Sequence, residues 1–194
     1  MKSTITGVIL AGGKSSRMGA DKALLKLEGR PFVAHVASSL QAVFDRVILV
    51  ANDTSAYGFL GLDTFGDIFL DCGPLGGMHS ALTHADGGDI FVSACDTPFI
   101  TRDLVQYIVG FQSGAPARIP SFNQQLHPLC GIYTQKCLPM IAERLESRHL
   151  RVLDFIEEAK ATVIPISPDL SFYKEDLFSN FNSTRDFPRG PNNP

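Results

Sequence analysis

A continuous apolar run near the start of the chain leads directly into a loop of glycines, hydroxyl side chains and cations. Residues 5 to 10 read ITGVIL, a β-branched pattern typical of a strand that is buried on both faces of a parallel sheet. The loop that follows, residues 10 to 22, reads LAGGKSSRMGADK. Because no other stretch is so rich in these residue types, we expect the fold to be organised around this buried strand and its loop.

The composition of the loop favours a polyphosphate ligand. Gly12 and Gly13 let the backbone turn sharply and leave N–H groups that can form an anion-binding concavity. Lys14, Arg17 and Lys22 add three cations within nine residues, and such cations hold phosphate oxygens by charge-assisted hydrogen bonds. The loop therefore predicts a triphosphate site.

Two better-known phosphate loops do not fit the spacing of these glycines. A Walker loop needs a glycine five positions before its Gly-Lys pair, but position 8 is Val8 and the nearest glycine is Gly7. The glycines also fail to match the GxGxxG pattern, so the segment gives no support to a dinucleotide cofactor site.

Length and composition are typical of a globular domain. With 194 residues, of which 44% are hydrophobic and 19% charged, the chain is long enough to bury a sizeable core. We expect a single domain over residues 1 to 187 and a disordered tail over residues 188 to 194, where proline, glycine and asparagine gather. The net charge of −3 argues against a nucleic-acid binder, which usually carries a clustered basic face.

The sequence also favours a cytoplasmic protein. No apolar run approaches the ~20 residues that span a bilayer, and the first residues lack the apolar core of a secretory signal, so no membrane contact is expected. The four cysteines form no C-x-x-C pair, which argues against a zinc site or a disulfide framework. We interpret them as small buried residues with reduced thiols.

Apolar runs alternate with helical periodicity along the rest of the chain. Strands are predicted at residues 46–51, 63–70, 89–94 and 161–167, and helices at residues 31–43, 73–85, 101–112, 138–148 and 151–159. Residues 114–134 instead read as two short strands around a polar turn, an arrangement that is antiparallel. The sequence therefore predicts a three-layer, doubly wound α/β fold with a mostly parallel sheet and a small antiparallel excursion.

Two of the predicted strands end in polar residues suited to a ligand, because ligands bind beyond the carboxyl ends of strands in open parallel sheets. Asn52 follows the strand at 46–51, although an asparagine chosen only for its turn geometry stays an alternative. Asp96 follows the strand at 89–94, and a carboxylate there suits Mg²⁺, which takes few protein ligands. Asp96 could instead cap the next helix, but Thr101 and Asp103 already serve that start.

The first loop resembles the signature of nucleotidyltransferases built on a Rossmann-like sheet, in which a strand is followed by LAxGxxxRMG and then by a lysine. The Gly12-Gly13 pair and the Asp21-Lys22 pair are most similar to the molybdenum cofactor guanylyltransferases of the MobA type. Further segments along most of the chain resemble the same family. They are GPLGG from residue 73, CDTPF from residue 95, HPL from residue 127 and FSNFNST from residue 178.

This resemblance implies roles for particular residues. The implied GTP contacts are Leu10, Ala11, Gly12, Gly13, Lys14, Lys22, Asn52, Asp67 and Asp96, with Mg²⁺ held at Asp96. The implied catalytic residues are Arg17, Lys22 and Asp96, and the implied acceptor contacts are His127, Asn180 and Asn182. The chain departs from the family at Val50, where a second asparagine is common, and at Ser183, Arg185 and Phe187 near its end.

The activity implied by the resemblance is transfer of GMP from GTP to molybdenum-molybdopterin, by Mg-assisted in-line attack of the acceptor phosphate on the α-phosphate. The implied partners are GTP and molybdopterin or molybdenum-molybdopterin, and transient contacts with other cofactor-biosynthesis proteins or with molybdenum-enzyme chaperones could follow.

Two alternatives to this activity stay open. A sibling enzyme could be a molybdopterin cytidylyltransferase or a sugar-phosphate guanylyltransferase; Gly12-Gly13, where cytidylyl relatives tend to show Ala-Gly, favours GTP over CTP by resemblance alone. A catalytically silent nucleotide-binding module is the second alternative. The presence of both Lys22 and Asp96 argues against it.

Overall fold

The β-branched apolar runs form a central sheet in the computed structural model, which describes residues 5–11 and 22–179 of the chain. Eight strands make up this sheet, in the order β10-β7-β9-β6-β1-β4-β5 with β8 paired to β7. Their bounds are β1 (Thr6–Leu10), β4 (Val47–Val50), β5 (Asp63–Phe65), β6 (Ile90–Ala94), β7 (Ala117–Phe122), β8 (Gln125–Leu126), β9 (Cys130–Tyr133) and β10 (Thr162–Ile166). The predictions outside the described residues concern Gly12, Gly13, Lys14, Arg17, Asn180, Asn182 and the tail from residue 188.

The sheet is parallel except at β8 and β9. β1 pairs in parallel with β4 and β6, β5 pairs in parallel with β4, and β10 pairs in parallel with β7. β9 runs antiparallel to both β6 and β7, and the short β8 runs antiparallel to β7. The predicted mostly parallel sheet with a small antiparallel excursion is therefore confirmed.

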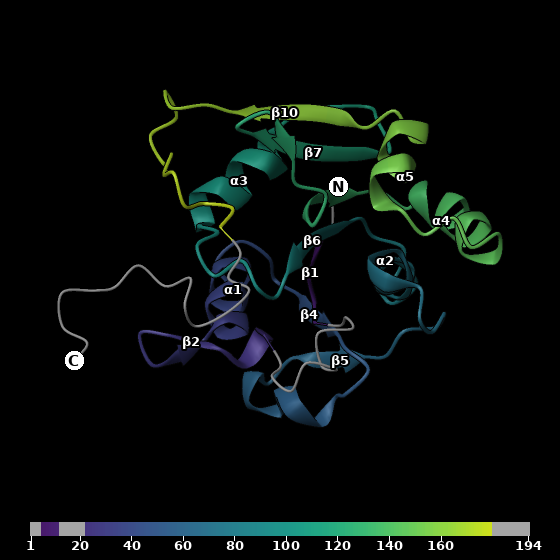
Figure 1. Ribbon diagram of the computed structural model, residues 1–194, viewed down its shortest axis with the longest axis horizontal. Helices are drawn as coiled ribbons and strands as arrows, with labels where there is room; N and C mark the ends of the chain where they lie inside the picture. The colour runs from purple at the N-terminus through teal and green to yellow at the C-terminus, as the bar shows by residue number, and fades with distance from the viewer. Residues whose placement is uncertain (1–4, 12–21, 180–194) are drawn as a thin grey trace.

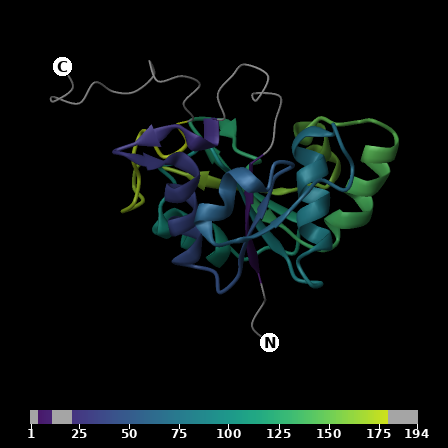
Figure 2. The same ribbon diagram turned by 90° about the horizontal axis from the view of Figure 1, so that it is seen from below.

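Helices cover both faces of the sheet (Figure 1 and Figure 2). The helices are α1 (Phe32–Gln41), α2 (Gly73–Thr83), α3 (Arg102–Gly110), α4 (Cys137–Glu146) and α5 (Val152–Glu158), with short 3-10 turns η2 (Lys22–Leu24) and η3 (Ser55–Leu60). Successive side chains of a strand point to opposite faces, so Ile9 packs in the cluster with α1 and α3, whereas Val8 packs in the cluster with α2, α4 and α5. Three layers result, as predicted. None of the described helices is long and apolar enough to cross a bilayer.

The local structure around α1 follows from its turn residues. Glu28 and Gly29 have φ values of 52° and 80°, and they form the turn between β2 (Lys26–Leu27) and β3 (Arg30–Pro31). Pro31 is the N-cap residue of α1, with φ −57° and ψ 144°, so the helix begins at Phe32, one residue after its predicted start. The helix ends at Gln41, two residues before the predicted end at Val43.

The strand predicted over residues 63 to 70 is wrong in its length. β5 ends at Phe65, and the backbone N–H of Asp67 donates to the side-chain Oδ1 of Asn52 at 2.9 Å. A side chain that captures a backbone N–H in this way competes with a sheet ladder, which explains the early end of the strand. Asp67 therefore lies in the loop between β5 and α2 and not at the centre of a strand.

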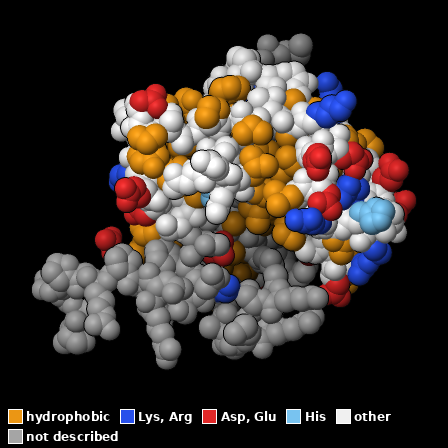
Figure 3. Space-filling model, turned by 45° about the horizontal axis from the view of Figure 1, so that its top comes forward, with side chains coloured by type: hydrophobic (Ala, Val, Ile, Leu, Met, Phe, Trp, Pro, Cys, Tyr) orange, Lys and Arg blue, Asp and Glu red, His pale blue; other side chains and the backbone are white. Residues whose placement is uncertain are grey.

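The last strand, β10, lies at one edge of the described sheet. Beside it a shallow apolar groove is lined in part by Leu126, Leu153 and Val163, and Figure 3 shows hydrophobic side chains gathered on this side of the molecule. Pro165 within β10 has no N–H, as is typical of an edge strand.

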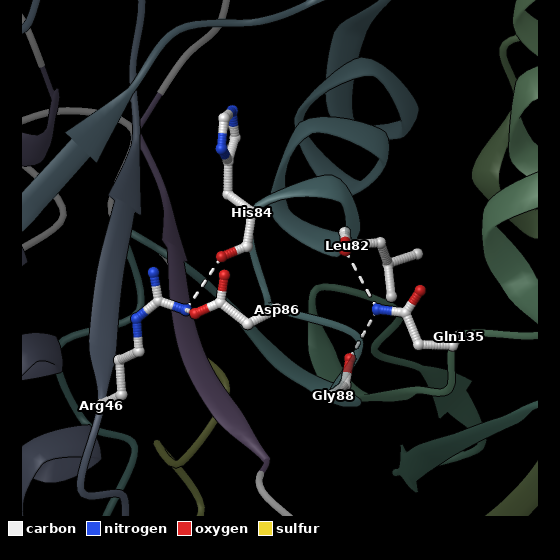
Figure 4. Close-up of polar contacts among 6 residues, drawn as sticks. All are labelled: Arg46, Leu82, His84, Asp86, Gly88 and Gln135. Atoms are coloured by element: carbon white, nitrogen blue, oxygen red, sulfur yellow. Dashed lines mark hydrogen bonds and ion pairs between the residues drawn. The ribbon is translucent and has the colours of Figure 1, made fainter.

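Arg46 ties the C-terminal end of α2 to the start of β4 (Figure 4). Its Nη1 donates to the carbonyl of His84 and to Oδ2 of Asp86, both at 2.9 Å. The last carbonyls of a helix lack partners within the helix, so the bond to His84 satisfies one of the acceptors at this end. The guanidinium thereby joins α2 to a neighbouring strand at the amino edge of the sheet.

Gln135, just after β9, makes a second connection at the same end of α2. Its Nε2 donates to the carbonyl of Leu82 at 3.0 Å and to the carbonyl of Gly88 at 2.6 Å (Figure 4). Its backbone N–H donates to Oδ1 of Asp89 at 3.2 Å. One side chain therefore bridges α2, the turn that follows it and the antiparallel part of the sheet.

Candidate active site

The carboxyl ends of the central strands meet at one edge of the sheet. Just beyond β1 the N–H of Ala11 donates to the carbonyl of Val50 at 2.9 Å, and the N–H of Cys95 donates to the carbonyl of Leu10 at 3.2 Å. These bonds continue the ladders of β1 with β4 and β6 past the last residues of the strands. The segments that begin at Ala11, Asn52 and Cys95 therefore leave the sheet side by side, where open parallel sheets bind ligands.

Leu10 and Ala11, two of the predicted GTP contacts, have part of their backbone engaged in these ladders. The Leu10 carbonyl and the Ala11 N–H both form the strand-to-strand bonds just described. Both side chains are buried. A contact with a nucleotide would therefore come from the Ala11 carbonyl or from apolar surface, and the GTP roles of the two residues stay predictions.

Asp96 lies in the turn that follows β6. Oγ1 of Thr97 donates to the carbonyl of Ala94 at 3.0 Å and fixes the shape of this turn. Burial raises the pKa of the Asp96 carboxyl, while a backbone hydrogen bond and the positive charge of Lys22 lower it. The charge of Lys22, at the start of η2, thus acts on Asp96, and both are among the residues predicted to be catalytic.

The alternative role for Asp96, capping the helix that follows, is not what the structure shows. Thr101 is the N-cap residue of α3, and its Oγ1 accepts a hydrogen bond from the N–H of Leu104 at 3.2 Å. Asp96 is several residues earlier and precedes a separate turn. Its carboxylate is thus available for another partner.

The donor set at Asp96 fits a magnesium ion better than a softer metal. Among the described residues, no group of three His, Cys, Asp or Glu side chains could hold a metal ion by itself. Mg²⁺ needs no such cage, because it binds through one or two carboxylates and completes its octahedral shell with phosphate oxygens and water. A half-buried carboxylate whose ionisation is disfavoured by burial also gains from a nearby cation. Asp96 could therefore hold Mg²⁺ together with a bound nucleotide.

Asn52, predicted at a strand end, and Asp67, predicted within the strand at 63–70, are in direct contact. Nδ2 of Asn52 donates to Oδ2 of Asp67 at 2.9 Å, and the Asp67 N–H donates back to Oδ1 of Asn52 at 2.9 Å. Burial raises the pKa of the Asp67 carboxyl, and the hydrogen bond from Asn52 acts in the opposite direction. The two residues therefore form one unit beside the ends of β4 and β5.

Helix α2 contributes two small residues that sequence reasoning did not assign to the site. The N–H of Ile68 donates to Oγ of the fully buried Ser80 at 2.8 Å. A Cβ on Gly77 would lie 3.1 Å from Cδ2 of Leu10 and 3.7 Å from Oδ1 of Asp67. The glycine-rich stretch GPLGG was a signal for this close approach, but the partner of each glycine depends on the packing of α2 against β1.

His127, predicted to bind the acceptor, lies in an aromatic cluster at the end of the β7–β9 excursion. Its ring stacks on Phe178 with the ring centroids 4.0 Å apart, and it meets Phe122 edge-on at 6.2 Å. Burial lowers the pKa of the imidazole, so the neutral form is favoured, while a backbone hydrogen bond at Phe122 raises it. The ring is thus placed for stacking more than for attraction of an anion, and its acceptor role stays a prediction.

Comparison with known proteins agrees with this geometry. A family model described as a MobA-like NTP transferase domain matches residues 7–161. The molybdenum cofactor guanylyltransferase of Syntrophotalea carbinolica is 32% identical over 186 residues, which cover 94% of this chain and 88% of that protein.

Solved structures show the same fold. The molybdopterin-guanine dinucleotide biosynthesis protein A of Archaeoglobus fulgidus superposes with a TM-score of 0.79 at 23% identity, covering 94% of each chain. A Mycobacterium tuberculosis protein, Rv0371C, solved as a complex with manganese, superposes with a TM-score of 0.65 at 20% identity, covering 84% of this chain and 88% of that chain. With the family model matched over most of its length, and with strand-end residues meeting at one edge of a doubly wound sheet, the chain belongs to the MobA-like NTP transferase family, as its first loop indicated.

Proposed function

We propose that this protein transfers GMP from GTP to molybdenum-molybdopterin, forming molybdopterin guanine dinucleotide and pyrophosphate. The observation that carries the proposal is the half-buried carboxylate of Asp96 in the turn after β6, on which the positive charge of Lys22 acts. The site thus combines a cation for phosphate oxygens with a carboxylate suited to a divalent ion. The Syntrophotalea relative, a molybdenum cofactor guanylyltransferase, supports guanylyl transfer in particular.

The proposed reaction is an in-line displacement. An oxygen of the acceptor phosphate forms a bond to the α-phosphorus of GTP while the bond from that phosphorus to the bridging oxygen breaks, and pyrophosphate leaves with the electron pair. Lys22, together with Arg17 of the preceding loop, stabilises the negative charge that grows on the phosphoryl oxygens. The acceptor phosphate is already ionised at neutral pH, so no side-chain nucleophile is needed.

Asp96 is proposed to hold Mg²⁺, and Gly12, Gly13 and Lys14 are proposed to bind the triphosphate. The ion supplies positive charge at the phosphate oxygens when it is bound. The manganese in the Mycobacterium structure supports a divalent ion in this family, and Mg²⁺ in particular is our proposal.

Base selection is proposed to depend on Asp67. A carboxylate can accept hydrogen bonds from the N1–H and amino group of guanine, and cytosine lacks an equivalent pair of donors. A site built for guanine leaves polar groups unpaired when the wrong base binds, so GTP should bind at least about tenfold more tightly than CTP or ATP. Isothermal titration with non-hydrolysable analogues measures this ratio. Equal affinity for CTP would favour the cytidylyltransferase alternative.

The acceptor is proposed to bind beside the β7–β9 excursion, near His127 and the segment with Asn180 and Asn182. The half-buried ring of His127, which stacks on the buried Phe178, is proposed to contact the flat pterin ring of the acceptor. Contacts with other cofactor-biosynthesis proteins or with molybdenum-enzyme chaperones stay predictions, as does the cytoplasmic location.

The test of the proposed function is pyrophosphate release by the purified protein with molybdenum-molybdopterin and each nucleoside triphosphate in turn. We expect release with GTP and a matching yield of the guanine dinucleotide. Release with CTP alone would indicate a cytidylyltransferase, and binding of GTP without release under any condition would indicate a silent nucleotide-binding module.

A further inference from the structure

Both polar atoms of the Asn52 amide bond to one neighbour, Asp67. Its Oδ1 accepts from the N–H of Asp67 and its Nδ2 donates to Oδ2 of the same residue, both at 2.9 Å. The opposite amide orientation would set N–H against N–H and oxygen against carboxylate, so the two bonds fix the orientation of the side chain. Asn52 thereby holds both the backbone and the carboxylate of Asp67.

The loop that carries Asp67 is held from its other side by α2. The N–H of Ile68 donates to Oγ of the buried Ser80 at 2.8 Å. Gly76 allows close packing, since a Cβ there would lie 2.9 Å from the carbonyl oxygen of Phe69. Asp67 and Ile68 are therefore held by hydrogen bonds from the segment after β4 and from α2, Phe69 packs closely against α2, and the Asp67 carboxylate is pre-organised before any ligand arrives.

One carboxylate oxygen of Asp67 is left for a ligand. Oδ2 accepts from Asn52, whereas Oδ1 accepts no hydrogen bond from the described residues. Gly77 on α2 has no side chain to cover this oxygen; a Cβ at that position would be in ordinary van der Waals contact with Oδ1, at 3.7 Å. The half-buried carboxylate is thus held at one oxygen and open at the other.

We propose that Asn52 is a positioning residue that acts on the nucleotide through Asp67, and that Oδ1 of Asp67 is the oxygen that accepts from the base. This inference rests on the proposed function, because it takes guanine as the base. It differs from the role predicted for Asn52 from the sequence, which was a contact with GTP itself. Loss of Asn52 should then matter only while Asp67 is present to be positioned.

A double-mutant cycle tests this dependence. Binding of a non-hydrolysable GTP analogue is titrated for the wild type, Asn52→Ala, Asp67→Ala and the double variant, since the triphosphate contacts keep binding measurable. We expect about a tenfold loss for Asn52→Ala, at least that loss for Asp67→Ala, and no further loss in the double variant. If Asn52→Ala loses the same factor in the Asp67→Ala background, Asn52 contacts the nucleotide directly and the proposal is overturned. An Asp67→Ala variant with wild-type affinity overturns it as well.

A conservative variant separates the two hydrogen bonds between Asn52 and Asp67, one to the carboxylate and one from the backbone N–H. Asn52→Asp keeps the size of the side chain and an oxygen for the Asp67 N–H, but it replaces the donor to Oδ2 with a second carboxylate. We expect GTP binding to fall at least as far as in Asn52→Ala, because the two carboxylates repel each other. Wild-type binding by Asn52→Asp would contradict the proposal.

A matched control lies close to Asn52, in the segment that follows β4. Ser55→Ala removes the 2.7 Å hydrogen bond from Oγ of Ser55 to Oδ1 of Asp53, which does not involve Asp67. GTP affinity should be unchanged in this variant, and an equal loss there would mean that Asn52→Ala acts only through general loosening of the loop. If the wild type does not bind GTP at all, the proposed function fails. If the wild type binds GTP and the cycle is additive, only the present inference fails.

Discussion

The two ends of helix α2 lie in contrasting surroundings. At its C-terminal end, Arg46 and Gln135 donate to carbonyls of the helix and of the turn after it, and these polar groups have partners within the protein. Its N-terminal half faces Asp67, a carboxylate that is bonded at one oxygen and whose pKa is raised by burial. Asp96, at the same edge of the sheet, has its pKa raised for the same reason.

This difference separates residues that stabilise the fold from residues kept ready for a ligand. A buried polar group that is fully bonded adds to stability, whereas a partly buried carboxylate without a full set of partners lowers it until a ligand or cation binds. Perturbed carboxylates therefore gather at the carboxyl edge of the sheet, while the amino edge carries the connections between elements. The following substitutions test this division.

Asp96→Asn should have the largest effect, on catalysis alone. Removal of the charge that we assign to the metal site should lower kcat by at least about 10²-fold, while the free energy of unfolding stays equal to that of the wild type or rises. Steady-state rates at saturating Mg²⁺, with a thermal melt as the folding control, measure both quantities. A rate within a few fold of the wild type would remove Asp96 from the proposed metal site.

Gln135→Ala should affect stability alone. Two side-chain hydrogen bonds to carbonyls of α2 and its following turn are lost, each worth about 1 kcal/mol, so the free energy of unfolding should fall by about 2 kcal/mol. GTP affinity of the folded protein should not change. Urea denaturation measures the first quantity, and Gln41→Ala at the exposed end of α1 is the matched control. A clear loss of GTP affinity in Gln135→Ala would contradict the assignment of stability to the amino edge of the sheet and of ligand binding to the carboxyl edge.

Lys22→Ala should lower kcat by at least about tenfold, or about 1.4 kcal/mol in the barrier, with a smaller change in KM for GTP. The reason is that a cation beside Asp96 is most valuable where charge develops during the reaction. Separate determination of kcat and KM checks the claim. A rise in KM with unchanged kcat would make Lys22 an anchor for the ground-state phosphates.

Asp67→Asn should have the smallest of these effects, and the effect is on stability. We expect the free energy of unfolding at neutral pH to rise by less than about 1 kcal/mol. A carboxyl whose pKa is raised in the folded state stabilises the fold fully at low pH and loses this contribution as pH rises through the folded pKa. The asparagine resembles the protonated form, so the two proteins should converge in stability below the ordinary pKa of aspartate. Melting temperatures across pH 3 to 8 test the sign. A variant that is less stable at neutral pH would contradict it.

Much of the fold follows from periodicity in the sequence. The predicted bounds of most strands and helices lie within about two residues of the observed ones. Each of these elements has an apolar pattern that is not interrupted along its length. The exception is β5, where Phe69 and Leu70 extend the apolar pattern but Asn52 captures the N–H of Asp67. A hydrogen bond between segments distant in sequence cannot be read from local pattern.

The sequence predicted the polar residues of the candidate site that follow strands, but not the α2 residues that pack against them. Asp96 and Asn52 stand out because they follow strong strands, and the structure brings each to the expected edge. Ser80 gave no such signal, because a small residue within a helix is ordinary until the helix is packed against a particular strand, and the GPLGG stretch indicated a close approach at Gly77 without showing its partners. The residues of the first loop from Gly12 to Arg17 lie outside the described residues, so their roles still depend on the sequence.

The central place of β1 in the sheet has a consequence for how the chain folds. β1 precedes every other described strand in the chain, yet its two neighbours are β4 and β6, and Thr6 pairs with Ile90. Pairing of such distant segments in parallel is slow, because a long loop must close before its contacts form. During synthesis the β6 edge of β1 therefore has no neighbouring strand until β6 has left the ribosome. An apolar strand with an unpaired edge makes the nascent chain prone to aggregate in this interval.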